Sequence, residues 1–321
     1  MSQQKPTIGV ALAARTSADA LSQIEDLEKM GIPAVWSTTG GIGGDALTFF
    51  AAAATRTNNM LMGTSIIPTY PRHPLVVAQQ TQVLAHLAPG RFRLGIGPSH
   101  QATIESNYGI SFKAPLGHLR EYLKILKTLF QTGEVNFDGR YYKAHGSIGS
   151  PVDIPVMASA LRRLSFELCG AEADGAISWV CPGIYLRDVA LPAMRKGSEQ
   201  ADRPMPPLIA HTPICVHDDP EDVRSAARNQ IGFYPRAPFY ASMFTDAGFP
   251  EASLGTWSDE MLDSVVLSGN ESRVEERLLE LLSFGVTEVI VSPITAGENT
   301  RESRNRTLNL VASIEKSMSR K

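Results

Sequence analysis

A strand-helix-strand unit over residues 60–98 constrains the fold of this chain more than any other stretch. Residues 60–67 and 91–98 are β-like, and residues 75–87 between them carry apolar side chains at helical spacing. Tyr70-Pro71-Arg72-His73-Pro74 opens that helix with a proline near its first turn, and Pro89-Gly90 ends it. Two strands joined through a helix run parallel. The sequence therefore predicts a parallel sheet covered by helices.

The carboxyl ends of parallel strands are where such proteins bind ligands. Gly95-Ile96-Gly97-Pro98-Ser99-His100, at the end of the second strand of the unit, puts small residues and a histidine at that position. This stretch predicts an enzyme with a site large enough for a cofactor.

The same alternation continues along the chain. Apolar runs typical of buried strands occupy residues 8–13, 34–38, 60–67, 92–98, 156–160, 175–180, 208–216 and 288–294. The clearest helical patterns occupy residues 18–30, 45–56, 74–87, 117–131, 162–171 and 299–317. Eight strands with helices between them predict an α/β fold, the (β/α)8 TIM barrel, which suits 321 residues with insertions.

Two stretches exceed the usual loop length and predict insertions into the barrel. Residues 132–155 include Asp138-Gly139 between apolar residues, a pattern typical of a β-hairpin. Residues 235–267 are rich in aromatic side chains and predict a helical excursion before the last strand. No internal repeat or hydrophilic linker divides the chain, so we expect residues 1–321 to form a single domain.

Charge and hydropathy limit the classes of partner. The net charge is -3, and no long run of Lys or Arg supplies the basic patch that nucleic acids and anionic membranes require. No segment approaches the roughly 18 apolar residues of a membrane span. With 43% hydrophobic and 20% charged residues, the chain is typical of a globular protein, and we expect its partners to be small molecules.

Cysteine usage and the N-terminal region indicate the compartment. Cys169, Cys181 and Cys215 are odd in number and widely spaced, so the sequence predicts neither a disulfide framework nor a zinc site, and no metal centre. Residues 7–14 imitate a short signal peptide, but the apolar run is short and Arg15 closes it. We expect that segment to be the first buried strand of a cytoplasmic protein.

Several motifs resemble the bacterial luciferase-like monooxygenase superfamily. The matching segments are Gly63-Thr64-Ser65-Ile66-Ile67-Pro68, Arg72-His73-Pro74 and Pro89-Gly90-Arg91-Phe92-Arg93-Leu94-Gly95-Ile96-Gly97. Weaker similarity at residues 121–123, 137–142, 155–157 and 173–175 extends the resemblance over most of residues 7–180. Within the superfamily the chain most resembles the branch that uses the deazaflavin coenzyme F420. The resemblance implies a luciferase-like TIM barrel with F420, or alternatively FMN, as cofactor.

The resemblance also implies which residues bind the cofactor. In this family the residues at Ser65 and Ile66 form a bulge with a non-prolyl cis peptide behind the flavin-like ring. The turn Gly97-Pro98-Ser99-His100 suits the ribityl chain or the phosphate. Ser159-Ala160-Leu161-Arg162 leads a strand into a helix N-terminus, which suits an anion. Many relatives have two glycines where Leu161 and Arg162 stand, so we expect a guanidinium to contribute to phosphate binding.

One departure from the family bears on catalysis. In the sugar-phosphate dehydrogenase branch an Asp-His pair follows the second strand, but here Trp36-Ser37-Thr38-Thr39-Gly40-Gly41 stands in its place. Thr38 can hydrogen-bond the ring system, yet a hydroxyl is no general base near neutral pH. That branch's glutamate after the fourth strand is replaced by His100, which we predict to be the catalytic proton donor or polariser. Trp179, at the end of the sixth strand, is expected to wall the site.

Taken with these residues, the resemblance implies an F420-dependent oxidoreductase that passes hydride between the deazaflavin and a small, partly apolar organic substrate. Two alternatives stay open: an FMN-dependent monooxygenase of the same superfamily, and a barrel that binds a flavin-like ligand without turnover. Members of the family are often dimers through helices near the second and third barrel units. Because Phe49, Phe50 and Ala51-Ala52-Ala53-Ala54 would allow such packing, we expect a homodimer.

Overall fold

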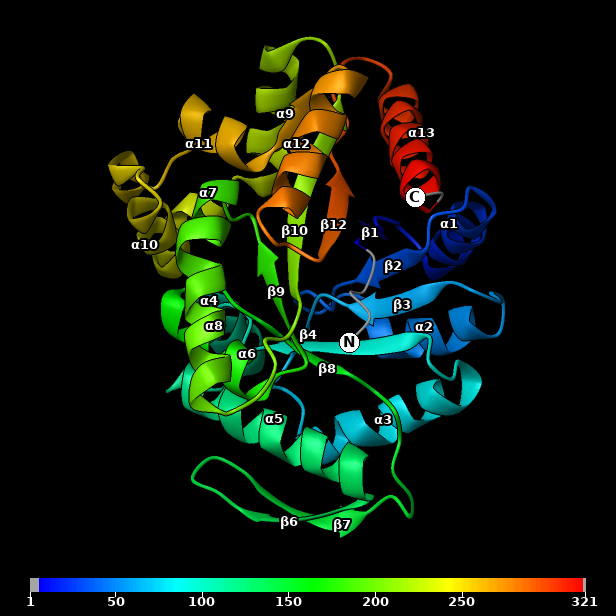
Figure 1. Ribbon diagram of the computed structural model, residues 1–321, viewed down its shortest axis with the longest axis vertical. Coiled ribbons are helices and arrows are strands. Elements are labelled where there is room, and N and C mark those ends of the chain that lie inside the picture. Colours follow the sequence, from blue (N-terminus) through cyan, green and yellow to red (C-terminus); the bar gives the residue numbers. More distant parts are fainter. Residues whose placement is uncertain (1–5, 320–321) are drawn as a thin grey trace.

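A computed structural model describes residues 6–319, and within them eight parallel strands close into a barrel surrounded by helices (Figure 1). The barrel strands are β1 (Thr7–Ala11), β2 (Ala34–Ser37), β3 (Leu61–Thr64), β5 (Phe92–Gly97), β8 (Val156–Ser159), β9 (Gly175–Trp179), β10 (Leu208–Val216) and β12 (Glu288–Pro293). They pair in that order, and β12 pairs with β1 to complete the ring. The predicted fold class is confirmed, and each predicted strand is a barrel strand with small differences at its ends.

The third predicted strand, residues 60–67, is interrupted. β3 ends at Thr64, the peptide bond between Ser65 and Ile66 is cis, and the two-residue strand β4 (Ile67–Pro68) then pairs with β5. The bulge thus lies at the residues predicted for it. Another short strand, β11 (Leu267–Gly269), pairs with the end of β10.

Helices cover the outside of the barrel (Figure 1). The predicted helices are present as α1 (Ser17–Lys29), α2 (Ala46–Ala54), α3 (Pro74–Leu87), α5 (Pro115–Thr132), α6 (Arg163–Glu172) and α13 (Thr300–Ser319). Polar caps begin several of them, as where Asp45 accepts from the N–H of Thr48 at 2.8 Å. Helical segments that the sequence analysis did not single out are α4 (Gln101–Tyr108), α7 (Gly183–Tyr185), η1 (Leu186–Ala190), α8 (Leu191–Gln200), α9 (Pro220–Ile231) and α12 (Glu271–Ser283).

The two long stretches between barrel units have the local structures that their patterns predicted. Residues 132–155 hold the antiparallel hairpin of β6 (Glu134–Asp138) and β7 (Lys143–Ser147). The Glu121 carboxylate secures its turn by accepting from three successive N–H groups, those of residues 140–142. Residues 235–267 are mainly helical and hold most of η2 (Tyr234–Arg236), followed by α10 (Pro238–Asp246), η3 (Pro250–Leu254) and α11 (Asp259–Val265).

A layer of apolar side chains fills the inside of the barrel, because alternate residues of a strand point inward. This interior layer takes one residue from each of five strands: Trp36, Met157, Ile177, Ile209 and Ile290. Glycines on the neighbouring strands make room for the indole, since a Cβ on Gly9 or Gly63 would lie 2.9 or 2.4 Å from the Trp36 ring. The barrel is therefore closed in its middle, and a large ligand can enter only at an end.

A buried ion pair lies at the amino-terminal end of the barrel. The guanidinium of Arg93 (β5) donates to both carboxylate oxygens of Glu288 (β12), at 2.5 and 2.9 Å. The indole N–H of Trp36 donates to the same carboxylate at 3.0 Å, and the Arg93 guanidinium lies 4.5 Å from the Trp36 ring centroid. The bidentate ion pair joins β5 to β12, and the indole hydrogen bond joins β2 to the same desolvated carboxylate.

Glu315, on α13, is a second buried carboxyl group near Glu288. Its side chain is 4% exposed and accepts a hydrogen bond from the N–H of Ile8. Burial, with the Glu288 charge adding to it, raises the pKa of Glu315 from 4.5 to about 7. Between about pH 4.5 and about pH 7 the Glu315 carboxyl group is therefore protonated in the folded state and ionised in the unfolded chain. The stability this proton contributes is fully present below about pH 4.5 and is lost as the pH rises through about 7.

We expect the Glu315→Gln substitution to remove this pH dependence. Relative to the wild type, the variant should gain stability between about pH 5 and about pH 8, by on the order of 2 kcal/mol, because the amide never ionises. Urea denaturation at both pH values measures the difference in the free energy of unfolding. Glu302→Gln, at an exposed position of the same helix, is the control. An identical pH response of wild type and Glu315→Gln would contradict the prediction.

A hydrophobic cluster that runs from Ile8 to Ile314 packs the helices onto the outer face of the barrel. The expectation of a single domain over residues 1–321 stays a prediction, and residues 1–5 and 320–321 lie outside the described part of the chain. Among the helices of residues 6–319, none combines the length and the hydropathy needed to cross a bilayer.

Candidate functional site

A cavity of about 890 Å³ lies at the carboxyl ends of the barrel strands. Strand ends that are far apart in the sequence converge on it, from β2, β3, β5, β8 and β9. Eleven of the twelve residues predicted to bind the cofactor line it: Thr38, Ser65, Ile66, Pro98, Ser99, His100, Ser159, Ala160, Leu161, Arg162 and Trp179.

Gly97, the twelfth, is not among the residues that line the cavity. Its carbonyl accepts from the N–H of Thr69 at 2.9 Å, and a Cβ at Gly97 would lie 2.2 Å from Ser159 Oγ. The missing side chain lets β5 and β8 approach each other at the barrel mouth. The position of Gly97 indicates close strand packing, and its predicted contact with a cofactor stays a prediction.

The end of β2 holds the cis peptide in place. Thr38 Oγ1 donates to the Ser65 carbonyl at 2.5 Å, and the N–H of Thr39 donates to the Ile66 carbonyl at 3.2 Å. From the other direction, the N–H of Ser65 donates to the Ser37 carbonyl at 2.9 Å. The Ser65-Ile66 wall of the cavity is therefore fixed by two backbone hydrogen bonds and one from the Thr38 side chain.

His100 is the N-cap residue of α4, and its side chain makes no capping hydrogen bond. Ser99 before it has a φ of 63°, in the left-handed region, and turns the chain out of β5. The His100 ring centroid lies 5.4 Å from that of Phe233 and 6.0 Å from those of Tyr234 and Tyr240. Desolvation lowers the pKa of His100 below its ordinary 6.5. The imidazole is therefore neutral at neutral pH and offers a ligand one donor and one acceptor.

The anion cradle predicted at residues 159–162 is only partly available. The N–H groups of Leu161 and Arg162 both donate to Ser165 Oγ, at 3.0 and 3.1 Å. The Arg162 guanidinium forms an ion pair with Asp246 of α10 at 2.9 Å, while its Nε is buried and has no partner among the described residues. At this segment the cavity is therefore lined by the Arg162 side chain, and the N–H groups of Leu161 and Arg162 are already paired.

Among the residues of the cavity wall that were not predicted are two polar ones that meet. His211 on β10 and Ser292 on β12 both line the cavity, with His211 Nε2 2.8 Å from Ser292 Oγ. Desolvation lowers the pKa of His211 from 6.5 to about 3, so this imidazole too is neutral at neutral pH. The strand period of two could have identified both residues. His211 lies two residues after Ile209 and Ser292 two residues after Ile290, so each polar side chain points to the same side of its strand as an apolar residue of the barrel interior.

The charged side chains that line the cavity are all positive. Among the described residues that line the cavity there is no Asp, Glu, Lys or Cys, and the charged side chains are Arg162 and Arg236. The indole N–H of Trp179, like the Nε of Arg162, is buried without a partner in the described part of the chain. The cavity therefore suits an anionic molecule that carries a ring. The two cations and the unpaired buried donors suit its anionic and acceptor groups, and the apolar walls suit the ring. Residues 6–319 contain no group of three or more candidate metal ligands.

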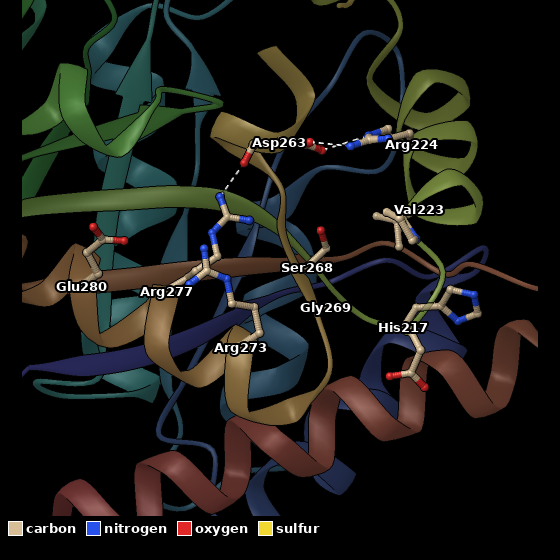
Figure 2. A pocket seen from close by; sticks show the side chains of 11 residues that line it. His217, Val223, Arg224, Asp263, Ser268, Gly269, Arg273, Arg277 and Glu280 are labelled. Carbon is tan, nitrogen blue, oxygen red and sulfur yellow. Dashed lines mark hydrogen bonds and ion pairs between the residues drawn. The ribbon is translucent and has the colours of Figure 1, made fainter. Parts of the chain in front are cut away.

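A second cavity, of about 400 Å³, lies between α9, β11 and α12 (Figure 2). Arg224 pairs there with Asp263 at 2.6 Å, and Arg277 donates to the main-chain carbonyls of Val266 and Asp263 at 2.6 and 2.5 Å. Several of its charged groups are thus already paired, and none of the predicted site residues lines it. The cavity at the barrel mouth is therefore the candidate site.

Comparison with known sequences places this geometry in context. A family model described as luciferase-like monooxygenase matches residues 3–288. The F420-dependent glucose-6-phosphate dehydrogenase of Beutenbergia cavernae is 33% identical over 204 residues, which are 60% of this chain and 60% of that protein. The match therefore spans about three fifths of that relative's length. The 5,10-methylenetetrahydromethanopterin reductase of Methanolobus tindarius is 26% identical over 289 residues, 83% of this chain and 88% of that protein.

Solved structures share the fold. An F420-dependent secondary alcohol dehydrogenase in complex with an F420-acetone adduct aligns with a TM-score of 0.82 at 18% identity, over 98% of this chain and 99% of that one. A type II Baeyer-Villiger monooxygenase in complex with FMN, from Pseudomonas putida, aligns with a TM-score of 0.70 at 16% identity, over 98% of both chains. At these identities the likeness concerns the fold alone.

Proposed function

The chain belongs to the luciferase-like monooxygenase family, and from that premise we propose that it is an oxidoreductase that exchanges hydride between coenzyme F420 and a small organic substrate. The choice of F420 is supported by the dehydrogenases similar to this chain, whose names carry that coenzyme. The proposed site is the cavity at the barrel mouth.

The donor set of the cavity is the observation that carries the proposal. Its volume of about 890 Å³ is in the range of cofactor sites. The buried, unpaired Nε of Arg162 and Nε1 of Trp179 need acceptors, which the phosphate and ring oxygens of a flavin-like cofactor would supply. In this proposal Arg162 and Arg236 hold the phosphate, and Ser65, Ile66 and Trp179 form the wall behind the ring.

The chain's own part in the reaction is to position groups and to manage a proton. Bound in the cavity, the deazaflavin would supply two-electron hydride transfer, because its ring has carbon where flavin has its reactive nitrogen. His100, held neutral at the rim of the cavity, polarises the reacting groups through the one donor and one acceptor of its ring. Four aromatic residues near it, Phe233, Tyr234, Phe239 and Tyr240, line the cavity as an aromatic roof. This roof favours a partly apolar substrate and limits the access of water.

We expect the purified protein to bind F420 selectively when it is titrated, in separate experiments, with F420 and with FMN and followed by fluorescence. Arg162→Ala should weaken F420 binding by about tenfold or more, because a charge-assisted hydrogen bond to the phosphate is lost. Arg163→Ala, an exposed neighbour that does not line the cavity, is the matched control and should bind like the wild type. His100→Ala should still bind F420 but lose turnover.

Other outcomes of the titration separate the alternatives. A preference for FMN would favour the monooxygenase, a role seen in a structure with this fold. Tight F420 binding without hydride transfer to any tested ketone or alcohol would favour a non-catalytic carrier. Binding of neither cofactor would overturn the proposal.

Two further parts of the proposal concern the setting of the protein. We propose a homodimer through the helices of the second and third barrel units. Of the α2 residues expected to pack there, Phe50, Ala53 and Ala54 are instead buried within the protomer. The proposal is supported by an exposed apolar stripe on neighbouring α3, formed by Val76, Val83 and Leu87. We also propose the reducing cytoplasm as its compartment, because Cys169, Cys181 and Cys215 are buried and unpaired.

A further inference from the structure

We infer that His211 and Ser292 form a neutral hydrogen-bonding pair that binds the substrate oxygen, and that the substrate is therefore an uncharged ketone, aldehyde or alcohol. The inference rests on the proposed function, which it deepens by naming the substrate class. His211 would be a catalytic residue, because it touches the reacting group, and Ser292 a positioning residue that acts through His211.

The pair is built by two adjacent strands. β10 and β12 are parallel, and their register places Pro213 beside Ser292 and His211 beside Ile290. His211 Nε2 and Ser292 Oγ are 2.8 Å apart, directly above the interior layer that contains Ile209 and Ile290. The two side chains therefore meet at the floor of the cavity, where the barrel closes.

One ring nitrogen of His211 remains free for a ligand. Within residues 6–319 no hydrogen-bond partner reaches Nδ1, and Nδ1 is not among the buried polar atoms that lack a partner. His211 lines the cavity, so Nδ1 is its accessible end. The Trp179 ring, whose centroid lies 4.2 Å from that of His211, restricts rotation of the imidazole.

A neutral imidazole can hydrogen-bond both the alcohol and the carbonyl form of a substrate. When the Ser292 hydroxyl donates to Nε2, the proton of His211 is on Nδ1, which then donates to a carbonyl oxygen. When Nε2–H donates to Ser292 Oγ, Nδ1 is an acceptor for the hydroxyl of an alcohol. The pair carries no net charge in either state.

The protons balance in this arrangement. As an alcohol is oxidised, its carbon loses a hydrogen with the bonding electron pair to the oxidised deazaflavin of the proposed function. The hydroxyl proton passes to Nδ1, the Nε2 proton passes to Ser292 Oγ, and the serine's own proton leaves to solvent. Reduction of a carbonyl reverses each transfer.

The surroundings of His211 select for an uncharged group. The side chain is 7% exposed, and no carboxylate lines the cavity to stabilise an imidazolium. A substrate carboxylate or phosphate placed here would meet a neutral imidazole and lose its hydration without a cation to replace it. The cations of the lining, Arg162 and Arg236, are assigned to the cofactor phosphate.

The test is ligand-observed NMR on the 321-residue chain with F420 bound, with cyclohexanone as probe and cyclohexanecarboxylate as its charged counterpart. We expect cyclohexanone to bind and the carboxylate not to bind. His211→Phe should weaken cyclohexanone binding by about tenfold, and Ser292→Ala by about threefold, with F420 affinity within about twofold of the wild type. Ser178 lies on neighbouring β9 between two residues that line the cavity, but does not itself line it. Ser178→Ala removes a buried hydroxyl there and should change neither affinity.

A spectroscopic readout separates hydrogen bonding from packing. Ring ¹⁵N shifts report the tautomer of a histidine, and those of His211 are assigned by their loss in His211→Gln. We expect cyclohexanone to move the wild-type signals toward the Nδ1–H tautomer, and Ser292→Ala to reduce this response.

Four outcomes would each overturn the inference: unchanged ¹⁵N shifts, unchanged affinity in His211→Phe, absence of cyclohexanone binding, or equal binding of the carboxylate. Failure of the wild type to bind F420 is a different result and would overturn the proposed function; the cyclohexanone titration then runs on the protein alone.

Discussion

Replacing Gly95 by alanine is expected to prevent the chain from forming a stable barrel. A Cβ on Gly95 would lie 1.8 Å from the Thr64 carbonyl oxygen and 2.8 Å from Ile177 Cδ1. The carbonyl belongs to the backbone, and Thr64 is further tied to Gly95 because its Oγ1 accepts from the Gly95 N–H and donates to the Gly95 carbonyl, both at 2.8 Å. With no room to relax, the loss should exceed about 4 kcal/mol, a large part of the stability of a typical domain.

Thermal denaturation followed by circular dichroism measures this effect, together with the yield of folded protein. Gly44→Ala is the matched control, because a Cβ there would meet no atom within 4 Å and the residue is exposed. The control should melt within a few degrees of the wild type. Equal melting temperatures for Gly95→Ala and Gly44→Ala would show that β3 and β5 can move apart at little cost.

Removing the carboxylate of Glu288 should cost about 3–5 kcal/mol of stability. Glu288→Ala leaves the Arg93 guanidinium in the barrel without a counter-charge and deprives the Trp36 indole N–H of its acceptor. The Nε of Arg93 is already buried without a partner among the described residues, so the substitution adds to the unpaired donors of this guanidinium. Glu288→Gln keeps an acceptor for the indole and should lose less.

Urea denaturation at fixed pH gives the free energies of unfolding for this series. The control is Glu276→Ala, which breaks the contact with Arg273 at 2.5 Å, where the two side chains are 66% and 59% exposed. That exposed pair should contribute less than about 1 kcal/mol, because water and salt screen it. Comparable losses of unfolding free energy in Glu288→Ala and Glu276→Ala would mean that burial does not strengthen the contact between Arg93 and Glu288.

Most of the barrel could be predicted because its strands carry local signals. Each strand is a short apolar run that ends in small or turn-forming residues, and the motifs around residues 63–100 joined two of them through a helix. α4 escaped because Gln101–Tyr108 has no apolar stripe, with Ile104 its one buried residue. α9 and α12 could have been found, since Asp219 before Pro220 and the cap residue Asn270 are ordinary helix starts.

The candidate site could be predicted only where its residues follow strand ends. Thr38, Ser65, His100, Ser159 and Trp179 each stand at or after such an end, and the structure brings them to one cavity. The loss of free N–H groups at Leu161 and Arg162 depended on Ser165, a local capping interaction that the sequence analysis did not consider. Gly97 was placed at the right strand end, but only the packing of β5 against β8 explains why it is a glycine.

The eight strands, the parallel order of the first units and the polar residues at the strand ends could all be predicted from the sequence, because period and turn chemistry are properties of neighbouring residues. Which of those residues meet depends on how the strands are arranged in the barrel. His211 and Ser292 are 81 residues apart, and they come within 2.8 Å because β10 and β12 are adjacent and held in one register. The buried contact of Arg93 with Glu288, 195 residues away, arises in the same way, because closure of the barrel brings both side chains to its interior.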